Sequence, residues 1–244
     1  MSRLRSLLFA IFQLILTPPY AVLCCALFFL SARQRFWVIK QWCSANVWAA
    51  RVLCGIRYVV IGRENIPATS HLILSKHSST FETVALSSIF FPISFVAKRE
   101  LLWLPFFGWA FALASPITIN RSAGSQALQQ MVAQGRDRLA KGFWIVIFPE
   151  GTRIRAGTRA KYKSGGARLA IGMDRPVLPV AHNAGYLWPK GAWGKTAGTI
   201  TISIGRPIPA TGREPLELTA EVERWIEAEV ERLGDPRSVR TVAA

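Results

Sequence analysis

Short apolar runs alternate with amphipathic stretches along most of the chain, from residue 57 to residue 234. Runs that are typical of buried strands occupy residues 57–61, 71–75, 93–97, 117–119, 143–148, 177–181 and 199–204. Stretches with helical spacing of apolar positions lie at residues 80–89, 101–113, 126–141, 165–171 and 217–233. This alternation predicts an α/β fold with a largely parallel central sheet flanked by helices. Residues 57–234 are expected to form this domain, and residues 235–244 a loose tail.

The first 56 residues have a different pattern. Residues 4–30 are almost wholly apolar, and Thr17-Pro18-Pro19 interrupts them. As one helix they would be about 40 Å long, which exceeds a hydrocarbon core of about 30 Å. Proline lacks a backbone N–H and clashes with the preceding helical turn. The proline pair is therefore expected to break the helix into halves of about 20 Å, each too short to span a membrane.

The basic residues around this segment argue against a plain span. The first 63 residues contain eight Arg or Lys and no Asp or Glu. Two basic pairs flank the segment, Arg3 with Arg5 and Arg33 with Arg35. A plain span would place one pair outside, against the positive-inside tendency. We therefore expect a bent, half-inserted hairpin with both pairs at the cytoplasmic headgroups. A cleaved signal peptide is the alternative, but the apolar run is long for one and no clear cleavage site follows it.

Residues 33–56 extend the predicted anchor. A helical wheel gives them a basic stripe formed by Arg33, Lys40, Ser44 and Arg51, with tryptophans at positions 37, 42 and 48 on other faces. Such a stripe is typical of an interfacial helix, although an ordinary amphipathic core helix shows the same period. Residues 1–56 are thus predicted to be a hydrophobic two-helix membrane anchor.

Composition agrees with a membrane setting. The net charge of +16 requires an anionic partner, such as nucleic acid, an anionic membrane surface or acidic ligands. A chain that is 51% hydrophobic and has nine tryptophans fits a membrane better than nucleic acid. The cysteines are Cys24, Cys25, Cys43 and Cys54, among apolar neighbours and without metal-binding spacing. They predict reduced thiols and a soluble part that faces the cytosol, and they exclude a thiol nucleophile in the predicted domain.

Candidate chemistry follows the predicted strand at residues 71–75, in the segment Lys76-His77-Ser78-Ser79-Thr80-Phe81-Glu82. His71 and His182 begin and end strands, and we expect them to be surface or hydrogen-bonded core residues. His77 lies in a strand-to-helix turn. On a regular helix, residues five apart point about 140° away from each other. The pair therefore requires His77 to precede the helix and Glu82 to reach back from its first turn, for which Ser78, Ser79 and Thr80 are suitable capping residues. Glu82 would then bind one ring nitrogen and leave the other as a base.

A second candidate follows the predicted strand at residues 143–148. Phe148-Pro149-Glu150-Gly151-Thr152-Arg153 opens a loop that continues with further cations to residue 163. A glycine turn beside an arginine can grip a phosphate through backbone N–H groups and the planar guanidinium. For Arg155, Arg159 and Lys161 an ordinary solvated face is an equally good interpretation. Ligands collect beyond the carboxyl ends of parallel strands, so we expect His77 and this loop to share one cleft.

Rival functions leave these segments unexplained. Residues 191–196 suggest a phosphate-binding P-loop, but Pro189 stands where its first glycine belongs and no strand precedes it. A lipase or esterase would need G-x-S-x-G, which is absent. A non-catalytic membrane-binding module would explain the charge and the anchor, but not His77, Glu82 and the hexapeptide at 148–153.

Several blocks, in order along the chain, resemble those of the 1-acylglycerol-3-phosphate acyltransferase (lysophosphatidic acid acyltransferase) family, bacterial type. His77 and Glu82 match its His-x4-acid block, in which Asp is commoner than Glu and Asn is commoner than Lys before the histidine. The hexapeptide at 148–153 matches without a mismatch. The other blocks are residues 98–101, residues 117–121 and residues 177–180, within a resemblance that covers residues 60–205.

The resemblance implies a membrane-bound acyltransferase. It would move a fatty acyl group from acyl-CoA or acyl carrier protein to the free hydroxyl of 1-acyl-sn-glycerol 3-phosphate (lysophosphatidic acid), forming phosphatidic acid. His77 and Glu82 would be catalytic, and the substrate-binding residues would be Lys98, Arg121, Glu150, Gly151, Thr152 and Arg153. The expected partners are membrane lipids, and no nucleic acid, metal or cofactor is expected. The expected location is the cytoplasmic face of the bacterial inner membrane. The resemblance does not decide between acyl-CoA and acyl carrier protein as the donor, and it does not exclude another lyso-lipid as the acceptor.

Overall fold

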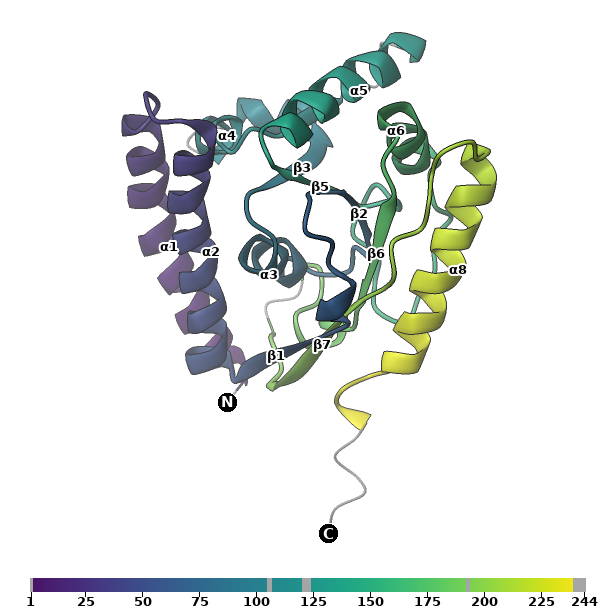
Figure 1. The fold of residues 1–244 in the computed structure, drawn as a ribbon. Coiled ribbons are helices and arrows are strands. Elements are labelled where there is room, and N and C mark those ends of the chain that lie inside the picture. The colour runs from purple at the N-terminus through teal and green to yellow at the C-terminus, as the bar shows by residue number, and fades with distance from the viewer. Residues whose placement is uncertain (1, 105–106, 120–123, 192–193, 239–244) are drawn as a thin grey trace.

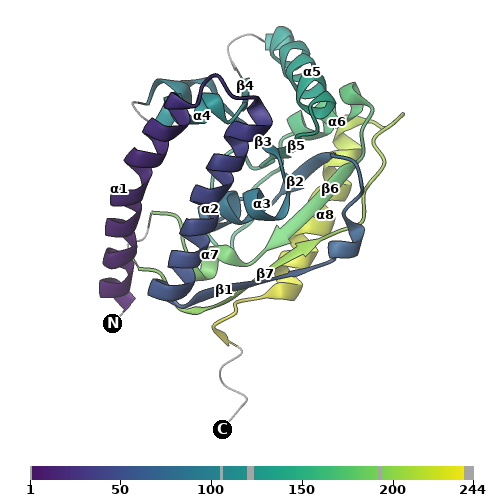
Figure 2. The ribbon, with the colours of Figure 1, turned by 60° about the vertical axis from the view of Figure 1, so that its left-hand side comes forward.

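The computed structural model describes residues 2–104, 107–119, 124–191 and 194–238 of the 244-residue chain. Two long helices, α1 (Ser2–Ala26) and α2 (Ala32–Cys54), lie side by side and pack against one side of an α/β body (Figure 1). The body has a central sheet with helices on both faces, as a second view shows (Figure 2). The predicted α/β fold is therefore confirmed.

The sheet has seven strands in the described residues. They are β1 (Ile56–Ile61), β2 (Leu72–Ser75), β3 (Ile93–Lys98), β4 (Ile117–Ile119), β5 (Trp144–Ile147), β6 (Val177–His182) and β7 (Gly198–Ile204). Their order is β1-β7-β6-β2-β5-β3-β4, and every neighbouring pair is parallel except β6 with β7. The central strands β2, β5 and β6 are buried along their whole length, which a parallel sheet covered on both faces requires.

Helices cover the two faces with separate apolar clusters. The remaining helices are α3 (Phe81–Ile89), α4 (Phe107–Leu113), α5 (Gly124–Ala140), α6 (Gly165–Met173), α7 (Ala184–Leu187), α8 (Pro215–Leu233) and the 3-10 turns η1 (Arg63–Asn65) and η2 (Arg99–Trp103). Alternate residues of β2 face opposite sides, because side chains alternate along a strand. Ile73 joins the cluster under α1, α2 and α3, whereas Leu72 and Leu74 join the cluster under α5, α6 and α8.

The predicted helix at 101–113 is wrong at its beginning. The chain there forms η2, and α4 begins only at Phe107. Leu104 is extended, with φ −69° and ψ 122°. The sequence has proline at position 105, and a proline disfavours helical geometry in the residue before it. The short helix α7 was not predicted, because four residues carry no readable period.

The predicted break at the prolines is also wrong, because α1 continues through Pro18 and Pro19. An internal proline costs about 3 kcal/mol, but contacts on both sides of the pair hold this helix. Phe9 before it and Cys24 after it are buried. Gln13 also donates a hydrogen bond to Asn46 of α2 at 2.9 Å. The chain reverses instead between α1 and α2, so the two basic pairs lie at opposite ends of a helix about 37 Å long.

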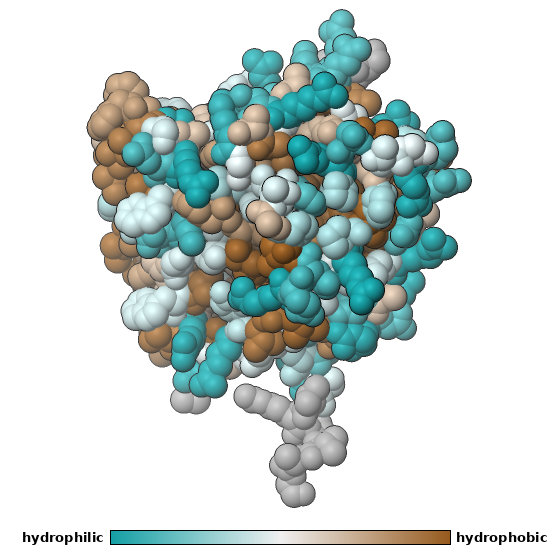
Figure 3. Space-filling model, viewed as in Figure 1, coloured by the Kyte–Doolittle hydropathy of each residue, from teal (hydrophilic) through white to brown (hydrophobic). Residues whose placement is uncertain are grey.

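Helix α1 has one face inside the protein and one outside. Within the described residues, Arg3–Ala26 is the one stretch of helix that is long and apolar enough to cross a membrane. Its outer face exposes Leu4, Leu7, Leu8, Ile11, Leu14, Ile15, Val22 and Leu23. Apolar surface accordingly gathers along the margin of the molecule where α1 lies (Figure 3).

Helix α2 has features of both alternatives that the sequence left open, an amphipathic core helix and an interfacial helix. Phe36, Ala49 and Ala50 belong to the same buried cluster as the sheet, as in a core helix. Trp37 and Trp48 are exposed on the other side, as in an interfacial helix. Since α1 and α2 share this cluster with the body, their buried faces are part of its core. The division of the chain at residue 56 stays a prediction.

The two faces of α1 should respond differently to truncation. Phe9 is fully buried and Leu14 is 73% exposed on the same helix. We expect Phe9→Ala to lower the free energy of unfolding in detergent by about 3–5 kcal/mol, because a large buried side chain leaves a cavity. Leu14→Ala should change it by no more than about 0.5 kcal/mol. Chemical denaturation measures both, and equal losses would contradict the assignment of the faces.

Candidate active site

Two loops meet at one edge of the sheet. Strands β2 and β5 are parallel neighbours, with Leu74 opposite Ile147. The loop after β2 carries His77 and leads into α3, and the loop after β5 carries the hexapeptide at 148–153. Since both strands end at the same edge, the two loops lie together, although 71 residues separate His77 from Phe148.

His77 and Glu82 meet in the geometry that the sequence requires. His77 precedes α3, and Glu82 lies in the first turn of that helix with none of its surface exposed. His77 Nδ1 and Glu82 Oε1 are 2.8 Å apart. The same carboxylate oxygen accepts a hydrogen bond from the Ser79 backbone N–H at 3.0 Å. The pair thus fixes the ring so that its Nδ1 side faces the protein.

The loop after β5 holds His77 on three further sides. The Phe148 ring stacks on the imidazole, with centroids 3.9 Å apart and planes 12° apart. Glu150 Oε1 accepts a hydrogen bond from the His77 backbone N–H at 3.1 Å. The His77 carbonyl accepts one from the Ile154 N–H at 2.8 Å. Sequence reasoning gave Phe148 and Ile154 no role, because stacking and backbone contacts leave no residue-type signal.

His77 lines a cavity of about 500 Å³ that has a cationic part and an apolar part. The cations are Lys98, Arg153, Lys163 and Lys190. The apolar wall is formed by Phe95, Val96, Leu101, Phe111, Ile119, Met131 and Ile147. A cavity with this division suits an amphiphile with an anionic head.

The predicted substrate-binding residues divide into three groups. Lys98, Gly151, Thr152 and Arg153 line the same cavity as His77. Glu150 does not line it, because its side chain is buried and directed at the His77 backbone. Arg121 lies outside the described residues. Lys163 and Lys190 line the cavity without having been predicted.

Gly151 is needed for the turn that joins these residues. Its φ of 70° is a conformation that only glycine adopts without strain. A side chain there would also begin 2.9 Å from Lys163 Nζ, so the glycine makes room for this cation. Arg155, Arg159 and Lys161 are exposed and do not line this cavity. Arg159 instead pairs with Glu231 of α8 at 2.8 Å.

A second, mainly apolar cavity adjoins the first. It has a volume of about 240 Å³ and lies among α1, α2, α3 and α4. Thr83, Phe95, Phe111 and Arg153 line both cavities. The N-terminal helices therefore form part of the wall beside the site.

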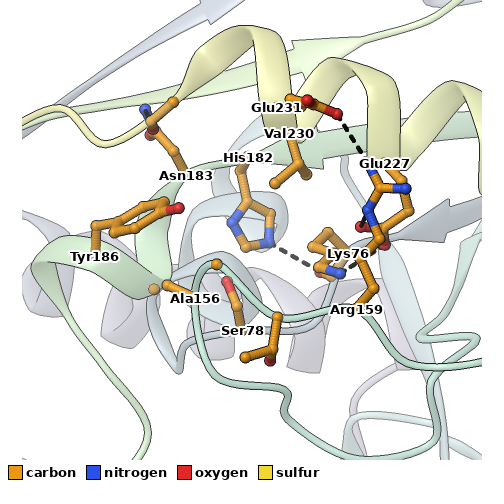
Figure 4. Close-up of a pocket in the computed structure, with 14 residues that line it drawn as sticks. Lys76, Ser78, Ala156, Arg159, His182, Asn183, Tyr186, Glu227, Val230 and Glu231 are labelled. Carbon is orange, nitrogen blue, oxygen red and sulfur yellow. Dashed lines mark hydrogen bonds and ion pairs between the residues drawn. The ribbon is translucent and has the colours of Figure 1, made fainter.

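A buried polar layer lies behind His77. His182 binds the Lys76 carbonyl through Nε2 at 2.8 Å, and Lys76 Nζ lies 2.6 Å from Glu227 of α8. Figure 4 shows Lys76 between these two partners. Burial raises the pKa of Glu150 to about 7 and lowers the pKa of His182. No local sequence signal links Lys76 with Glu227, since 151 residues separate them.

In the part of the chain that the structure describes, no group of three or more His, Cys, Asp or Glu side chains is placed to hold a metal ion. The paired His77 and Glu82, the neighbouring cations and the apolar wall can support proton transfer beside an anionic, partly apolar ligand.

Comparison with known proteins gives relatives of one kind. The acyltransferase family model matches residues 57–183. A 1-acyl-sn-glycerol-3-phosphate acyltransferase of Pseudomonas aeruginosa is 47% identical over 235 residues, which cover 93% of this chain and 91% of the relative. The enzyme of the same name from Saccharomyces cerevisiae is 28% identical over 181 residues, or 70% of this chain and 58% of the relative.

A solved structure supports the fold. The crystal structure of the 1-acyl-sn-glycerophosphate (LPA) acyltransferase PlsC from Thermotoga maritima matches with a TM-score of 0.78 over 95% of both chains, at 24% sequence identity. The model match and the Pseudomonas relative confirm the resemblance found in the sequence, and the chain belongs to the acyltransferase family that includes bacterial 1-acyl-sn-glycerol-3-phosphate acyltransferases.

Proposed function

We propose that the protein is a membrane-bound 1-acyl-sn-glycerol-3-phosphate O-acyltransferase. It transfers a fatty acyl group from a thioester, acyl-CoA or acyl carrier protein, to the free hydroxyl of lysophosphatidic acid and forms phosphatidic acid. The observation that carries this proposal is the shared cavity. A histidine with a carboxylate partner, an arginine and lysines, and an apolar wall all face it.

In the proposed mechanism His77 acts as a general base. Its Nδ1–H donates to Glu82, and its Nε2 accepts the proton of the acceptor hydroxyl. The hydroxyl oxygen attacks the thioester carbonyl, a new C–O bond forms, and the C–S bond breaks. The imidazolium then returns its proton to the leaving thiolate. Glu82 stabilises the imidazolium, so the substrate hydroxyl takes the part of the serine in a hydrolase triad and no acyl-enzyme is needed.

The cations of the cavity are proposed to bind the acceptor phosphate. Arg153 offers a planar fork for two phosphate oxygens, and its buried Nε has no hydrogen-bond partner among the described residues. Lys98 faces the same cavity, and Gly151 and Thr152 shape the turn beside it. The resemblance adds Arg121 to this set. For Glu150 the contact with the His77 backbone supports a role in holding the base rather than the substrate.

The apolar spaces are proposed to hold fatty acyl chains. The wall of the catalytic cavity and the neighbouring apolar cavity meet at Phe95 and Phe111. Because α1 lines the second cavity and exposes its outer face, a chain there would lie close to lipid. Other lyso-lipid acceptors would fit the same division of charge, and the donor is undecided between acyl-CoA and acyl carrier protein. A purified enzyme assayed with a panel of lyso-lipids and both donors decides both points.

The membrane arrangement that we propose differs from the hairpin expected from the sequence. Because α1 is continuous, a helix that lies along the cytoplasmic face of the inner membrane keeps Arg3 and Arg35 at the same headgroup layer. Its outer apolar face would contact acyl chains, and its inner face stays in the protein. The rival, a membrane-binding module without catalysis, shares this arrangement but leaves the His77 site unexplained.

The base can be tested by substitution. His77→Ala should lower turnover by on the order of 10² to 10⁴, the usual contribution of a positioned general base, with little change in acceptor KM. Glu82→Gln should also be severe, and Glu82→Asp milder if the shorter carboxylate still reaches the ring. Steady-state kinetics in detergent measures this. His71→Ala, at the other end of β2, is the control and should keep turnover. Near-normal turnover in folded His77→Ala would refute the assignment.

The proposed binding of the acceptor phosphate by Arg153 predicts different effects on the KM values of the two substrates. Arg153→Lys keeps the charge but loses the planar fork, so it should raise the KM of the acceptor more than that of the donor. The exposed Arg155, which does not line the cavity, gives the matched control Arg155→Lys with neither KM changed. If Arg153→Lys changes both KM values equally, Arg153 does not bind the acceptor phosphate.

The membrane arrangement predicts that both ends of α1 are inaccessible from outside the cell. In a variant whose four cysteines are replaced, single cysteines at the exposed headgroup positions 3 and 33 should not react with a membrane-impermeant thiol reagent added to sealed cells. Both should react after the cells are made permeable, which is the control for accessibility. Labelling of either position in sealed cells would require α1 to span the membrane.

A further inference from the structure

Four chemically active side chains are packed behind His77, away from the catalytic cavity. Lys76, Glu150, Tyr162 and Glu227 each expose 7% of their surface or less. They come from three separate parts of the chain: the loop after β2, the loop after β5 and the helix α8. Burying several charges is costly unless they satisfy each other. The four side chains are therefore expected to compensate each other and to have a structural or functional role.

The contacts centre on the ammonium group of Lys76. Its Nζ lies 2.6 Å from Glu227 Oε1 and 3.5 Å from Glu150 Oε1. The Tyr162 hydroxyl donates a further hydrogen bond to Glu227 at 2.8 Å. One cation thus lies between two carboxylates, and the closer carboxylate is itself fixed by a tyrosine. The arrangement fixes the position of the Lys76 ammonium, which is otherwise on a flexible side chain.

The second carboxylate leads directly to the catalytic histidine. The oxygen of Glu150 that faces Lys76 is the one that accepts the His77 backbone N–H at 3.1 Å. Burial opposes ionisation of Glu150 and raises its pKa to about 7, and the Lys76 ammonium acts in the opposite direction. A hydrogen bond to an ionised acceptor is shorter and about twice as strong as one to a neutral acceptor. The charge on Lys76 therefore affects how firmly His77 is held.

We propose that Lys76 is a positioning residue of the acyl-transfer site, whose ammonium, paired with Glu227 of α8, holds the Glu150 carboxylate on the backbone amide of His77. The proposal rests on the proposed role of His77 as the base. Lys76 reaches no reacting atom, since its side chain points to the side away from the catalytic cavity, between His182 and Glu227 (Figure 4). Helix α8, which carries none of the family blocks, thereby takes part in building the site.

The alternative is that Lys76 and Glu227 only stabilise the fold. The two ideas differ when both partners are neutralised together. Removing one member of a buried pair leaves an uncompensated charge and is strongly destabilising, whereas replacing both by neutral groups is often nearly neutral. A double substitution can therefore restore stability while it still leaves Glu150 without its cation.

The experiment compares Lys76→Met, Lys76→Met/Glu227→Gln and Glu150→Gln in the full chain. Lys76→Met should lower Tm, and the double variant should recover most of this loss. The double variant should nevertheless show kcat lowered on the order of 10- to 100-fold, the range expected for a slightly misplaced base, with both KM values unchanged. Glu150→Gln keeps an acceptor of the same shape without the charge, and its kcat should fall comparably. The triple variant should fall no further, since all three substitutions act through one contact.

The matched control uses a partly exposed ion pair at the start of α8 that does not touch the cluster. Arg213 and Glu221 are 2.8 Å apart, and Arg213→Met/Glu221→Gln should leave kcat unchanged. A double variant of Lys76 and Glu227 with wild-type kcat would overturn the proposal. So would wild-type kcat in Glu150→Gln, which decides the matter if the double variant does not fold. If His77→Ala keeps full turnover, the proposed function itself fails; if only the cluster variants keep it, the positioning role alone fails.

Discussion

The site depends on the parallel pairing of β2 with β5. Leu72, Ile73 and Leu74 pair with Ile145, Val146 and Ile147, and both strands are buried on both faces. A slip of one residue would turn every one of these side chains to the opposite face, so packing on both sides fixes the register. With the register fixed, the residue after each strand has a definite neighbour in the other loop. The stacked Phe148 and the backbone bonds of His77 follow from this position.

One short segment serves both halves of the site. The hexapeptide at 148–153 stacks on the imidazole through Phe148 and presents Arg153 to the cavity. A carboxylate in a loop that is proposed to bind a phosphate would normally repel it. Glu150 avoids this conflict because its side chain is buried and directed away from the cavity, with Lys76 beside it. The acidic residue of the motif is thus compatible with an anionic ligand for a reason that only the side-chain directions reveal.

Local patterns predicted the features that local physics controls. Every predicted strand is present, because short apolar runs closed by glycine or polar residues have few alternatives in a covered sheet. The His77 and Glu82 geometry was predictable from their spacing and the helix start. The break predicted at the proline pair was wrong, since contacts of Phe9, Gln13 and Cys24 with residues distant in sequence stabilise the continuous helix α1. The Lys76–Glu227 pair could not be predicted for the same reason. It depends on the strand order and on the position of α8, and no local pattern in the sequence indicates either.

The buried face of α1 shows why the N-terminal helices cannot be considered apart from the site. Phe9 packs edge-on against Trp188 with centroids 4.9 Å apart, and Lys195 places its ammonium within 4.9 Å of both rings. The Trp188 carbonyl accepts a hydrogen bond from the Ser79 hydroxyl at 2.6 Å. The Ser79 backbone N–H in turn donates to the Glu82 oxygen that binds His77. Packed aromatic rings and short hydrogen bonds have little freedom to adjust independently. The helix that carries the outer apolar face and the Glu82 carboxylate that binds the His77 ring therefore belong to one continuous set of contacts.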